Sequence, residues 1–325
     1  MTLTDHPATA ALRLELADYP VLFQAADGRA ILAQRSYRRL VAIELASLVM
    51  GSLLGAAVGW VAASARVAGV VSAITFLIAI LARIVRERRG DDRLWFDARA
   101  VAETAKTQTW RYAMRVPPFD DDPTADRRFV RELGAVLHAR SDLVLTNDAA
   151  NGATNQISAK MRAIRAMPLL ERRDVYVESR LRDQADWYRR SAIRHGRLGQ
   201  RWSWGSLAAE GLAVIAAVLA LQLPGLGDLG FLGILGAVAA AFTAWGQAGR
   251  HGELAKSYGL AYQELLLITG FAESARQESD LHELVRDAEA AISREHTMWI
   301  AKRSDRDLER RTAPSYANGS EETLS

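Results

Sequence analysis

The sequence predicts an all-α integral membrane protein with four transmembrane helices in two tight hairpins, plus long cytoplasmic helices. Three observations support this fold class. Apolar residues are concentrated in two stretches, near 40–85 and near 203–248, and each stretch is interrupted once by a very short turn. Each half of a stretch has about the 20 apolar residues that a helix needs to cross a bilayer core about 30 Å thick. The rest of the 325-residue chain is strongly charged, with helical spacing of its apolar residues and no strand pattern.

The first hairpin is expected over residues 40–64 and 67–85, with only the residues 65–66 between its helices. Glu44 is the one charge in the first of these helices. The alternative interpretation is a soluble helical protein with two deeply buried hairpins. We consider it weaker, because four segments of this length are hard to bury in so small a chain.

The second hairpin is expected over residues 202–223 and 229–245. Glu210 is the one charge in its first helix, and its second helix is uncharged. The turn at 224–228 contains proline and glycine, which end helices.

The orientation follows from the basic residues that flank the hairpins. They lie beside the four ends remote from the turns and are Arg29, Arg35, Arg38, Arg39, Arg86, Arg88, Arg89, Arg93, Arg189, Arg190, Arg194, Arg197, Arg201, Arg250 and Lys256. Arg66 is the one basic residue in the first turn, and the second turn has none. Because basic flanks stay inside, both turns should face outward and both termini should be cytoplasmic.

Charged helices are expected between the two hairpins. Their apolar spacing predicts helices over residues 86–112, 124–140 and 157–166. The first should break near Gly90, because glycine interrupts helices. A longer helix should begin near Glu171 and run directly into the membrane, with a kink at Gly196 or Gly199.

Two further long helices are expected after the second hairpin, over residues 250–270 and 272–303. Both segments are rich in Ala, Leu, Glu and Arg. The apolar positions with helical spacing include Leu260, Leu267 and Phe271. Residues 306–325 are polar and lack periodicity, so we expect a disordered tail there.

The two halves of the chain repeat each other. VAIELASLV at 41–49 aligns without gaps with LAAEGLAVI at 207–215, and Glu44 and Glu210 share a column. We therefore divide the chain into a first repeat at 1–150, a second repeat at 151–305, and the tail. Both hairpins enter from the cytoplasm, so the repeat is parallel, unlike the inverted repeats of many secondary transporters.

Four stretches resemble the SLATT family, the SMODS- and SLOG-associating two-transmembrane effectors. PLLERRDVYVESRLRDQADWYRRSA at 168–192 is similar to the start of a SLATT domain, and EAAISREHTMW at 289–299 is similar to its end. LWFDARAVAETAKTQTWRY at 94–112 and YPVLFQAADGRAILAQRSY at 19–37 are similar to another SLATT subtype. The resemblance covers nearly the whole chain, as two tandem copies.

This resemblance implies a membrane effector of a bacterial conflict system, located in the inner (plasma) membrane. The family is predicted to make pores or channels. Many of its members are found beside nucleotide-second-messenger synthases or SLOG-type nucleotide sensors. Because this chain carries no such domain, the resemblance implies a separate nucleotide-signal sensor or synthase as its partner.

Glu44 and Glu210 are the intramembrane polar candidates for a pore. A carboxylate inside a bilayer costs several kcal/mol unless it is paired, protonated or in contact with water. One interpretation of Glu44 is that it reaches the interface and pairs with an arginine. Glu210 lies deeper, so a pore-facing position is as well supported for it as a paired one. Rings of carboxylates in an oligomer would favour cations.

Small residues predict close helix packing. Gly51, Gly55 and Gly59 are spaced by four on one helix, and Gly230, Gly233 and Gly236 are spaced by three. Glycine lets helix backbones approach closely in lipid, so we expect contacts within a hairpin or between subunits. A gate or pore wall is the minority interpretation.

A family-like motif lies on the helix that enters the second hairpin and comprises Arg180, Gln184, Trp187 and Tyr188. It could couple cytoplasmic events to the membrane. The structural alternative is a helix-to-helix contact, either with the face of Arg99 and Glu103 or with the face of Glu289 and Glu295.

Other kinds of site are not indicated. The chain has no cysteine, its six histidines lack metal-ligand spacing, and no phosphate-binding glycine loop is present. The net charge is only +3. We therefore expect no catalytic site, cofactor or metal, and no nucleic-acid partner.

Two functional hypotheses follow. The first is a homo-oligomeric channel or pore in the lipid bilayer, gated from the cytoplasmic side and conducting cations, in a bacterial defence or stress pathway. The second is a non-conducting, membrane-anchored scaffold or sensor whose cytoplasmic helices recruit partners.

Overall fold

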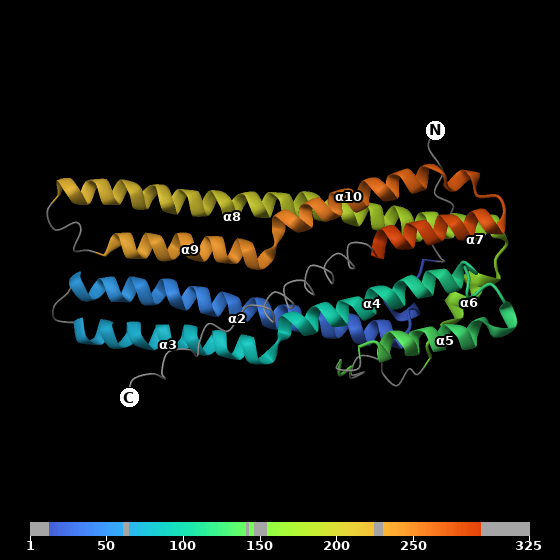
Figure 1. Cartoon of the computed structure of the whole chain (residues 1–325), viewed down its shortest axis with the longest axis horizontal. Helices are drawn as coiled ribbons and strands as arrows, with labels where there is room; N and C mark the ends of the chain where they lie inside the picture. Colours follow the sequence, from blue (N-terminus) through green and yellow to red (C-terminus); the bar gives the residue numbers. More distant parts are fainter. Residues whose placement is uncertain (1–12, 61–64, 141–142, 146–154, 224–229, 294–325) are drawn as a thin grey trace, which may run out of the picture.

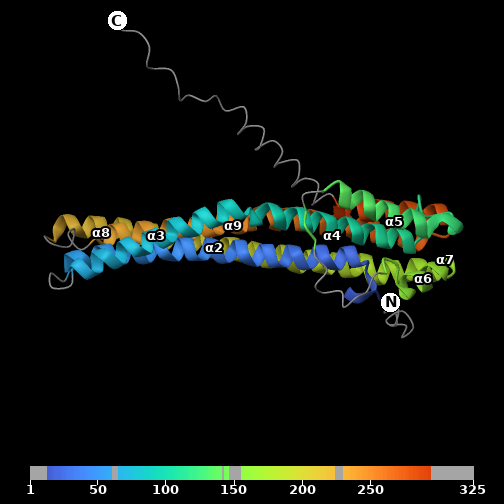
Figure 2. The same ribbon diagram turned by 90° about the horizontal axis from the view of Figure 1, so that it is seen from below.

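The computed structural model describes residues 13–60, 65–140, 143–145, 155–223 and 230–293. Within these ranges the chain is helical and contains no strand, so the predicted all-α class is confirmed. The molecule is a long rod (Figures 1 and 2). Two helical hairpins form one end, and shorter helices form the other end, which we call the helical base.

The two hairpins are α2 (Val21–Trp60) with α3 (Ala65–Arg89), and α8 (Asp183–Gln222) with α9 (Phe231–Gly249). The last residues of α2 and α8 and the first residues of α3 and α9 lie at the same end of the rod, so the repeat is parallel (Figure 1). Four helices are long and apolar enough to cross a membrane, as predicted. Only 6–17% of the residues in their most apolar windows are buried, which leaves a broad apolar surface for lipid. We use the predicted spans as the membrane-spanning segments.

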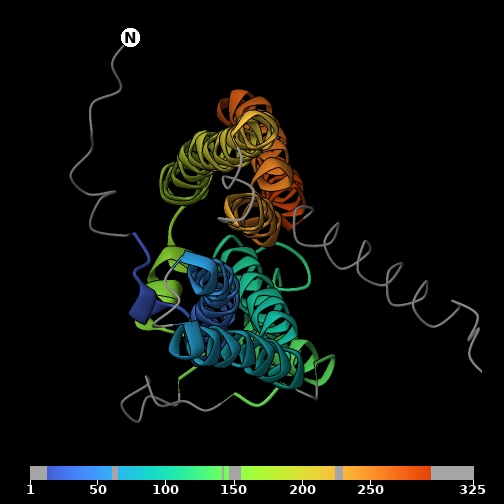
Figure 3. The same cartoon turned by 90° about the vertical axis from the view of Figure 1, so that its left-hand side faces the viewer.

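The hairpins pack against each other through α2 and α9. Seen along the rod from the hairpin end, the four helices lie as two neighbouring pairs (Figure 3). Gly230 begins α9 with a left-handed backbone, at φ +67°, and a Cβ there would lie 2.8 Å from the Cβ of Ala56. Only glycine fits this contact without a shift.

The second helix of each hairpin continues into the helical base after one left-handed residue. Gly90, at φ +57°, separates α3 from α4 (Asp91–Ala113), where the break was predicted. Arg250, at φ +47°, separates α9 from α10 (His251–Gly270). A left-handed conformation is unfavourable for arginine, because its Cβ crowds the following carbonyl.

The first helix of the second hairpin begins far inside the base. α7 (Leu169–Tyr176), the π-helical turn η3 (Val177–Arg182) and α8 form one continuous helical path. Gly196 and Gly199 lie inside α8, which continues through both. The irregular part of this path is therefore η3, more than ten residues before the glycines.

The remaining helices of the base are short. They are the 3₁₀ turns η1 (Leu16–Asp18) and η5 (Ala272–Ser274), together with α5 (Asp122–His138), α6 (Ala159–Ala166) and a helix over 278–293. The prediction of one helix from 272 was wrong, because η5 and an extended residue, Ala275, precede the last helix. The predicted tail at 306–325 lies outside the described residues.

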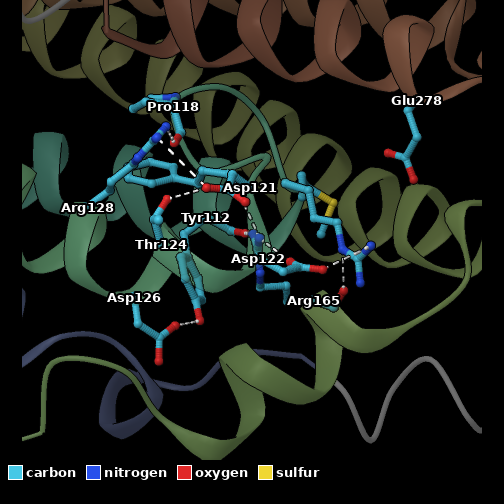
Figure 4. Close-up of polar contacts among 12 residues, drawn as sticks. Tyr112, Pro118, Asp121, Asp122, Thr124, Asp126, Arg128, Arg165 and Glu278 are labelled. Atoms are coloured by element: carbon cyan, nitrogen blue, oxygen red, sulfur yellow. Dashed lines mark hydrogen bonds and ion pairs between the residues drawn. The ribbon is translucent and has the colours of Figure 1, made fainter.

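Buried arginines join the turn between α4 and α5 to the rest of the base. Arg165 donates to the carbonyls of Tyr112 (2.7 Å) and Phe119 (2.6 Å), and its guanidinium lies 4.9 Å from the Tyr112 ring. Figure 4 shows Arg165 beside Asp122, and Tyr112 directed toward Asp126. Arg172 donates to the Met114 carbonyl at 3.0 Å. The buried aromatic core of the base therefore has charged side chains that satisfy its backbone carbonyls.

Candidate functional site

Glu44 forms an ion pair across the first hairpin. Its Oε2 accepts from Nη2 of Arg86 at 3.0 Å and from Nε at 3.2 Å. Both side chains are mostly covered, at 15% and 25% exposed. The arginine comes from the last turn of α3, which also holds Arg88 and Arg89. Within this one chain, the Glu44 carboxylate is therefore neutralised.

Glu210 has a different environment in the second hairpin. Its Oε1 accepts from Ser206 Oγ at 2.8 Å, and Ser206 Oγ lies 2.7 Å from Thr243 Oγ1. Ser206 is buried between α8 and α9, whereas Glu210, one turn later on the same face of α8, is exposed. Within the described residues, no basic side chain lies at ion-pair distance from Glu210.

The glycines divide into closed and open positions. A Cβ on Gly51 would lie 2.9 Å from Thr75 Oγ1, and one on Gly55 would lie 3.4 Å from Ser72 Oγ. Ser72 also donates to the Gly51 carbonyl at 2.8 Å, so this face of α2 lies against α3.

Gly233 and Gly236 lie on a more open part of α9. A Cβ added to either residue would meet no described atom within 4 Å, so their face is open in a single copy. Gly230 differs from them, because it lies against Ala56. The side-chain surroundings of Gly59 lie outside the described residues.

Arg180 forms the most buried ion pair of the described residues. Its Nε and Nη2 donate to Glu289 Oε1 and Oε2 at 2.9 and 2.8 Å, and both side chains are 2% exposed. Tyr176 donates to the same carboxylate at 3.1 Å, and Thr107 donates at 2.8 Å. Thr107 belongs to α4, so this cluster joins both repeats.

The electrostatics of this cluster follow from its burial. Burial raises the pKa of the Tyr176 hydroxyl well above its ordinary value, and the Glu289 carboxylate raises it further. Burial alone would lower the pKa of Arg180, but the attraction of Glu289 outweighs it and raises that pKa. Arg180 is therefore positively charged over the whole physiological pH range.

The other motif residues face two directions. Gln184 lies near Arg180, at 3.5 Å between Oε1 and Nη1. Tyr188 donates to the Ile292 carbonyl at 3.3 Å, and its ring lies 5.7 Å from that of Tyr258 on α10. Trp187 packs edge-on against Tyr258 at 5.1 Å. The motif thus contacts both α10 and the helix over 278–293, while Glu295 lies outside the described residues.

Two histidines meet where the second hairpin joins the base, outside the membrane-spanning segments. Nδ1 of His195 on α8 lies 3.0 Å from Nδ1 of His251, the first residue of α10. Burial lowers the pKa of His195 to about 4, assisted by His251, Arg194 and Arg38. Burial and Arg38 also lower the pKa of His251. Both imidazoles are therefore neutral at pH 7.

Sequence reasoning missed this histidine contact, because the two residues are 56 positions apart and share no motif. It also missed Tyr176 and Thr107 as partners of Glu289. In the described part of the chain, no group of three or more His, Asp and Glu side chains is arranged to hold a metal ion.

These features define an all-α membrane protein with two parallel hairpins on a shared helical base. The chain belongs to the SLATT family. Residues 20–173 match SMODS and SLOG-associating 2TM effector domain 3, and residues 176–299 match SMODS and SLOG-associating 2TM effector domain 1. The predicted tandem arrangement is confirmed. No curated relative and no solved structure matches the chain.

Domains of this family are two-transmembrane effector domains linked to membrane-associated defence signalling. The two matches adjoin beside η3, on the helical path that leads into α8. The division of the chain at residues 150 and 151 stays a prediction.

Proposed function

We propose that the chain assembles into a homo-oligomeric, cation-conducting channel in the bacterial inner membrane, with its helical base in the cytoplasm. The main support for this proposal is the position of Glu210. Glu210 is an exposed residue of α8, inside an apolar span, and its carboxylate has no basic partner among the described residues. A carboxylate in the same span facing lipid would cost about 2.5–3.5 kcal/mol or more.

Assembly removes this cost. If several copies arrange α8 around a common axis, their Glu210 side chains face water and form a ring of negative charge. Such a ring attracts cations and repels anions. The hydrogen bond from Ser206 fixes the carboxylate on this side of the helix without neutralising it.

Two open apolar surfaces support contacts between copies. Gly233 and Gly236 leave a face of α9 that a neighbouring helix can approach closely. Outside the membrane-spanning segments, Leu260 and Leu267 on α10 and Phe271 directly after it are 56–71% exposed. Lipid cannot cover these residues of the base, so a second copy is the partner that we propose for them.

Gating from the base follows from the continuity of α8. Arg180 lies in η3 beside the buried cluster, and Glu210 lies 30 residues later on the same helical path. At 1.5 Å per residue the two are about 45 Å apart. A rotation of α8 at its end in the base would therefore also move the Glu210 carboxylate. A separate sensor or synthase of the same defence pathway would supply the signal.

The experiment is ion flux in liposomes with the purified full-length oligomer and its Glu210→Gln variant. We expect cation flux in the wild type and a decrease in cation preference of about tenfold in the variant. Glu44→Gln is the matched control, because Glu44 is already neutralised by Arg86. Flux with unchanged selectivity in Glu210→Gln would remove this residue from the pore.

The scaffold hypothesis makes the opposite prediction. An assembled oligomer that conducts no ions, with or without the Glu210 carboxylate, would favour a non-conducting anchor that recruits partners through the exposed leucines of α10.

A further inference from the structure

A cavity of about 240 Å³ lies in the helical base at the meeting of the two repeats. The segment before α2 contributes Arg13 and Tyr19, and α4 contributes Lys106. The second repeat contributes Ser179 and Arg180 from η3, together with Gln184 from α8. The proposed channel function does not use this cavity.

Lys106 is the uncompensated charge of this cavity. Its ammonium lies 5.6 Å from the centre of the Tyr19 ring, and no carboxylate of the described residues lies at ion-pair distance. The nearest carboxylates are already engaged, Glu103 with Arg99 at 2.6 Å and Glu289 with Arg180 at 2.8 Å.

The other cations of the cavity have partners. Arg13 pairs with Asp183 at the rim, and Arg180 pairs with Glu289 behind the wall. Burial lowers the pKa of Lys106, and the nearby positive charge of Arg180 lowers it further. A covered lysine beside a second cation is costly, and an anion in the cavity would remove that cost.

We propose that this cavity is a binding site for a small, soluble, phosphate-bearing anion. Lys106 supplies the unpaired positive charge, and Arg13, Ser179 and Gln184 supply hydrogen-bond donors at its edge. Charge-assisted hydrogen bonds of this kind are stronger than neutral ones. The Tyr19 ring forms an apolar part of the wall, suited to a ligand that is not entirely polar.

The place of the cavity argues for a soluble anion over a lipid headgroup. Lys106 lies 16 residues after Gly90 on α4, which is about 24 Å along the helix. α4 runs away from the hairpins, toward the far end of the rod (Figures 1 and 2). A headgroup at the end of the first hairpin therefore does not reach the cavity.

The cavity is also connected to the second hairpin through η3, which continues into α8. Ser179 and Arg180 both belong to η3, and π-helical turns are often found at functional sites. An anion bound to these residues would act on the point where α7 passes into α8. The effect on ion flux rests on the proposed channel function, whereas binding itself does not.

The test is isothermal titration calorimetry of the full-length protein in lipid nanodiscs, with sodium pyrophosphate as the probe. We expect saturable binding to the wild type, and an affinity at least about tenfold lower in Lys106→Met. Lys256→Met is the matched control, because it removes the same charge from an exposed position on α10, and its affinity should equal that of the wild type. Lys106→Arg, which keeps the charge, should retain binding.

Two controls make the result decisive. The melting temperature of Lys106→Met should not fall, because the substitution removes a covered charge, so lost binding cannot be attributed to unfolding. Affinity should be equal in zwitterionic nanodiscs and in nanodiscs containing phosphatidylglycerol. Competition by the anionic lipid, no saturable binding to the wild type, or equal binding by Lys106→Met would overturn the proposal. Because calorimetry requires no ion flux, it tests anion binding to this site independently of the proposed channel function.

Discussion

The first hairpin, α2 with α3, and the second hairpin, α8 with α9, each carry one glutamate inside an apolar span, at matching positions of the repeat. Glu44 is paired with Arg86 from the facing helix, whereas Glu210 has only hydroxyl groups near it, from Ser206 and Thr243. The composition of the second helix accounts for this difference. α3 ends with three arginines in its last turn, and α9 contains no basic residue.

Residues at matching positions of the two repeats therefore do not have the same surroundings, and we do not expect them to have the same role. In the first hairpin, the intramembrane carboxylate of Glu44 is paired with Arg86 of the same chain, as a structural role requires. In the second hairpin, the Glu210 carboxylate has no ion-pair partner among the described residues, so it can contact water or another copy of the chain. We therefore propose that the first hairpin supports the assembly and the second hairpin lines the ion path.

The largest effect is expected in the base that both hairpins share. Glu289→Gln leaves the fully buried Arg180 without its carboxylate, and loss of one partner of a buried pair costs about 3–5 kcal/mol. We expect a corresponding decrease in the unfolding free energy, measured by denaturant titration. Glu283→Gln, at an exposed position of the same helix, should change it by less than about 0.5 kcal/mol. Equal effects of the two substitutions would contradict the structural importance of the cluster.

A smaller effect tests the difference between the hairpins directly. Arg86→Gln leaves the mostly covered Glu44 carboxylate unpaired and should destabilise the protein by about 1–3 kcal/mol. Arg83→Gln is the control in the same helix, because its pair with Glu87 is exposed and worth little. Glu210→Gln should not destabilise the protein, since no ion pair is lost. If it did so as strongly as Arg86→Gln, Glu210 would have a charged partner that the structure does not describe.

The packing glycines should separate folding from assembly. Gly51→Ala places a Cβ 2.9 Å from Thr75 Oγ1, and we expect a loss of about 1–3 kcal/mol from this overpacking of the first hairpin. Gly236→Ala meets no atom within 4 Å, so it should leave the folding of one chain unchanged and weaken the oligomer. Size-exclusion chromatography with light scattering measures the second effect. An intact oligomer in Gly236→Ala would remove this face of α9 from the subunit contact.

The smallest effect concerns pH and belongs to the second hairpin alone. His195 has a folded-state pKa of about 4, below the value near 6.5 of an unfolded histidine. The unfolded chain therefore binds more protons between these values, and stability should fall as pH decreases from about 6.5 towards 4. We expect the melting temperature to decrease by about 2–4 °C between pH 7 and 5. His195→Gln should reduce this decrease, and an unaltered pH profile in that variant would assign the effect to other groups.

The sequence predicted the parts of this fold that depend on composition and local pattern. The two hairpins, the break at Gly90 and the tandem family assignment are of this kind. It could not indicate which arginine would reach Glu44, because Arg86 comes from the other helix of the hairpin. The contact between His195 and His251 likewise depends on tertiary packing.

Helical periodicity also did not indicate whether the apolar face of α10 points into the core or toward the outside. Leu260 and Leu267 show regular spacing on α10, yet both are exposed, and the core is formed by Ala261 and Leu265 on the other side. A pattern of 3.6 residues indicates an apolar face but not what covers it. The π-helical turn η3 had no sequence signal that we recognised, although two of its residues line the cavity.

The exposure of Glu210 to water inside the membrane can be tested by thiol labelling at this position. The chain has no cysteine, so Glu210→Cys introduces a single thiol without further changes. We expect this thiol, in the assembled oligomer in liposomes, to react with a charged, membrane-impermeant thiol reagent. Leu212→Cys, exposed at similar depth on another face of α8, should remain unreactive. An unreactive thiol at position 210, in an oligomer of confirmed assembly, would mean that Glu210 does not face water and does not line an ion path.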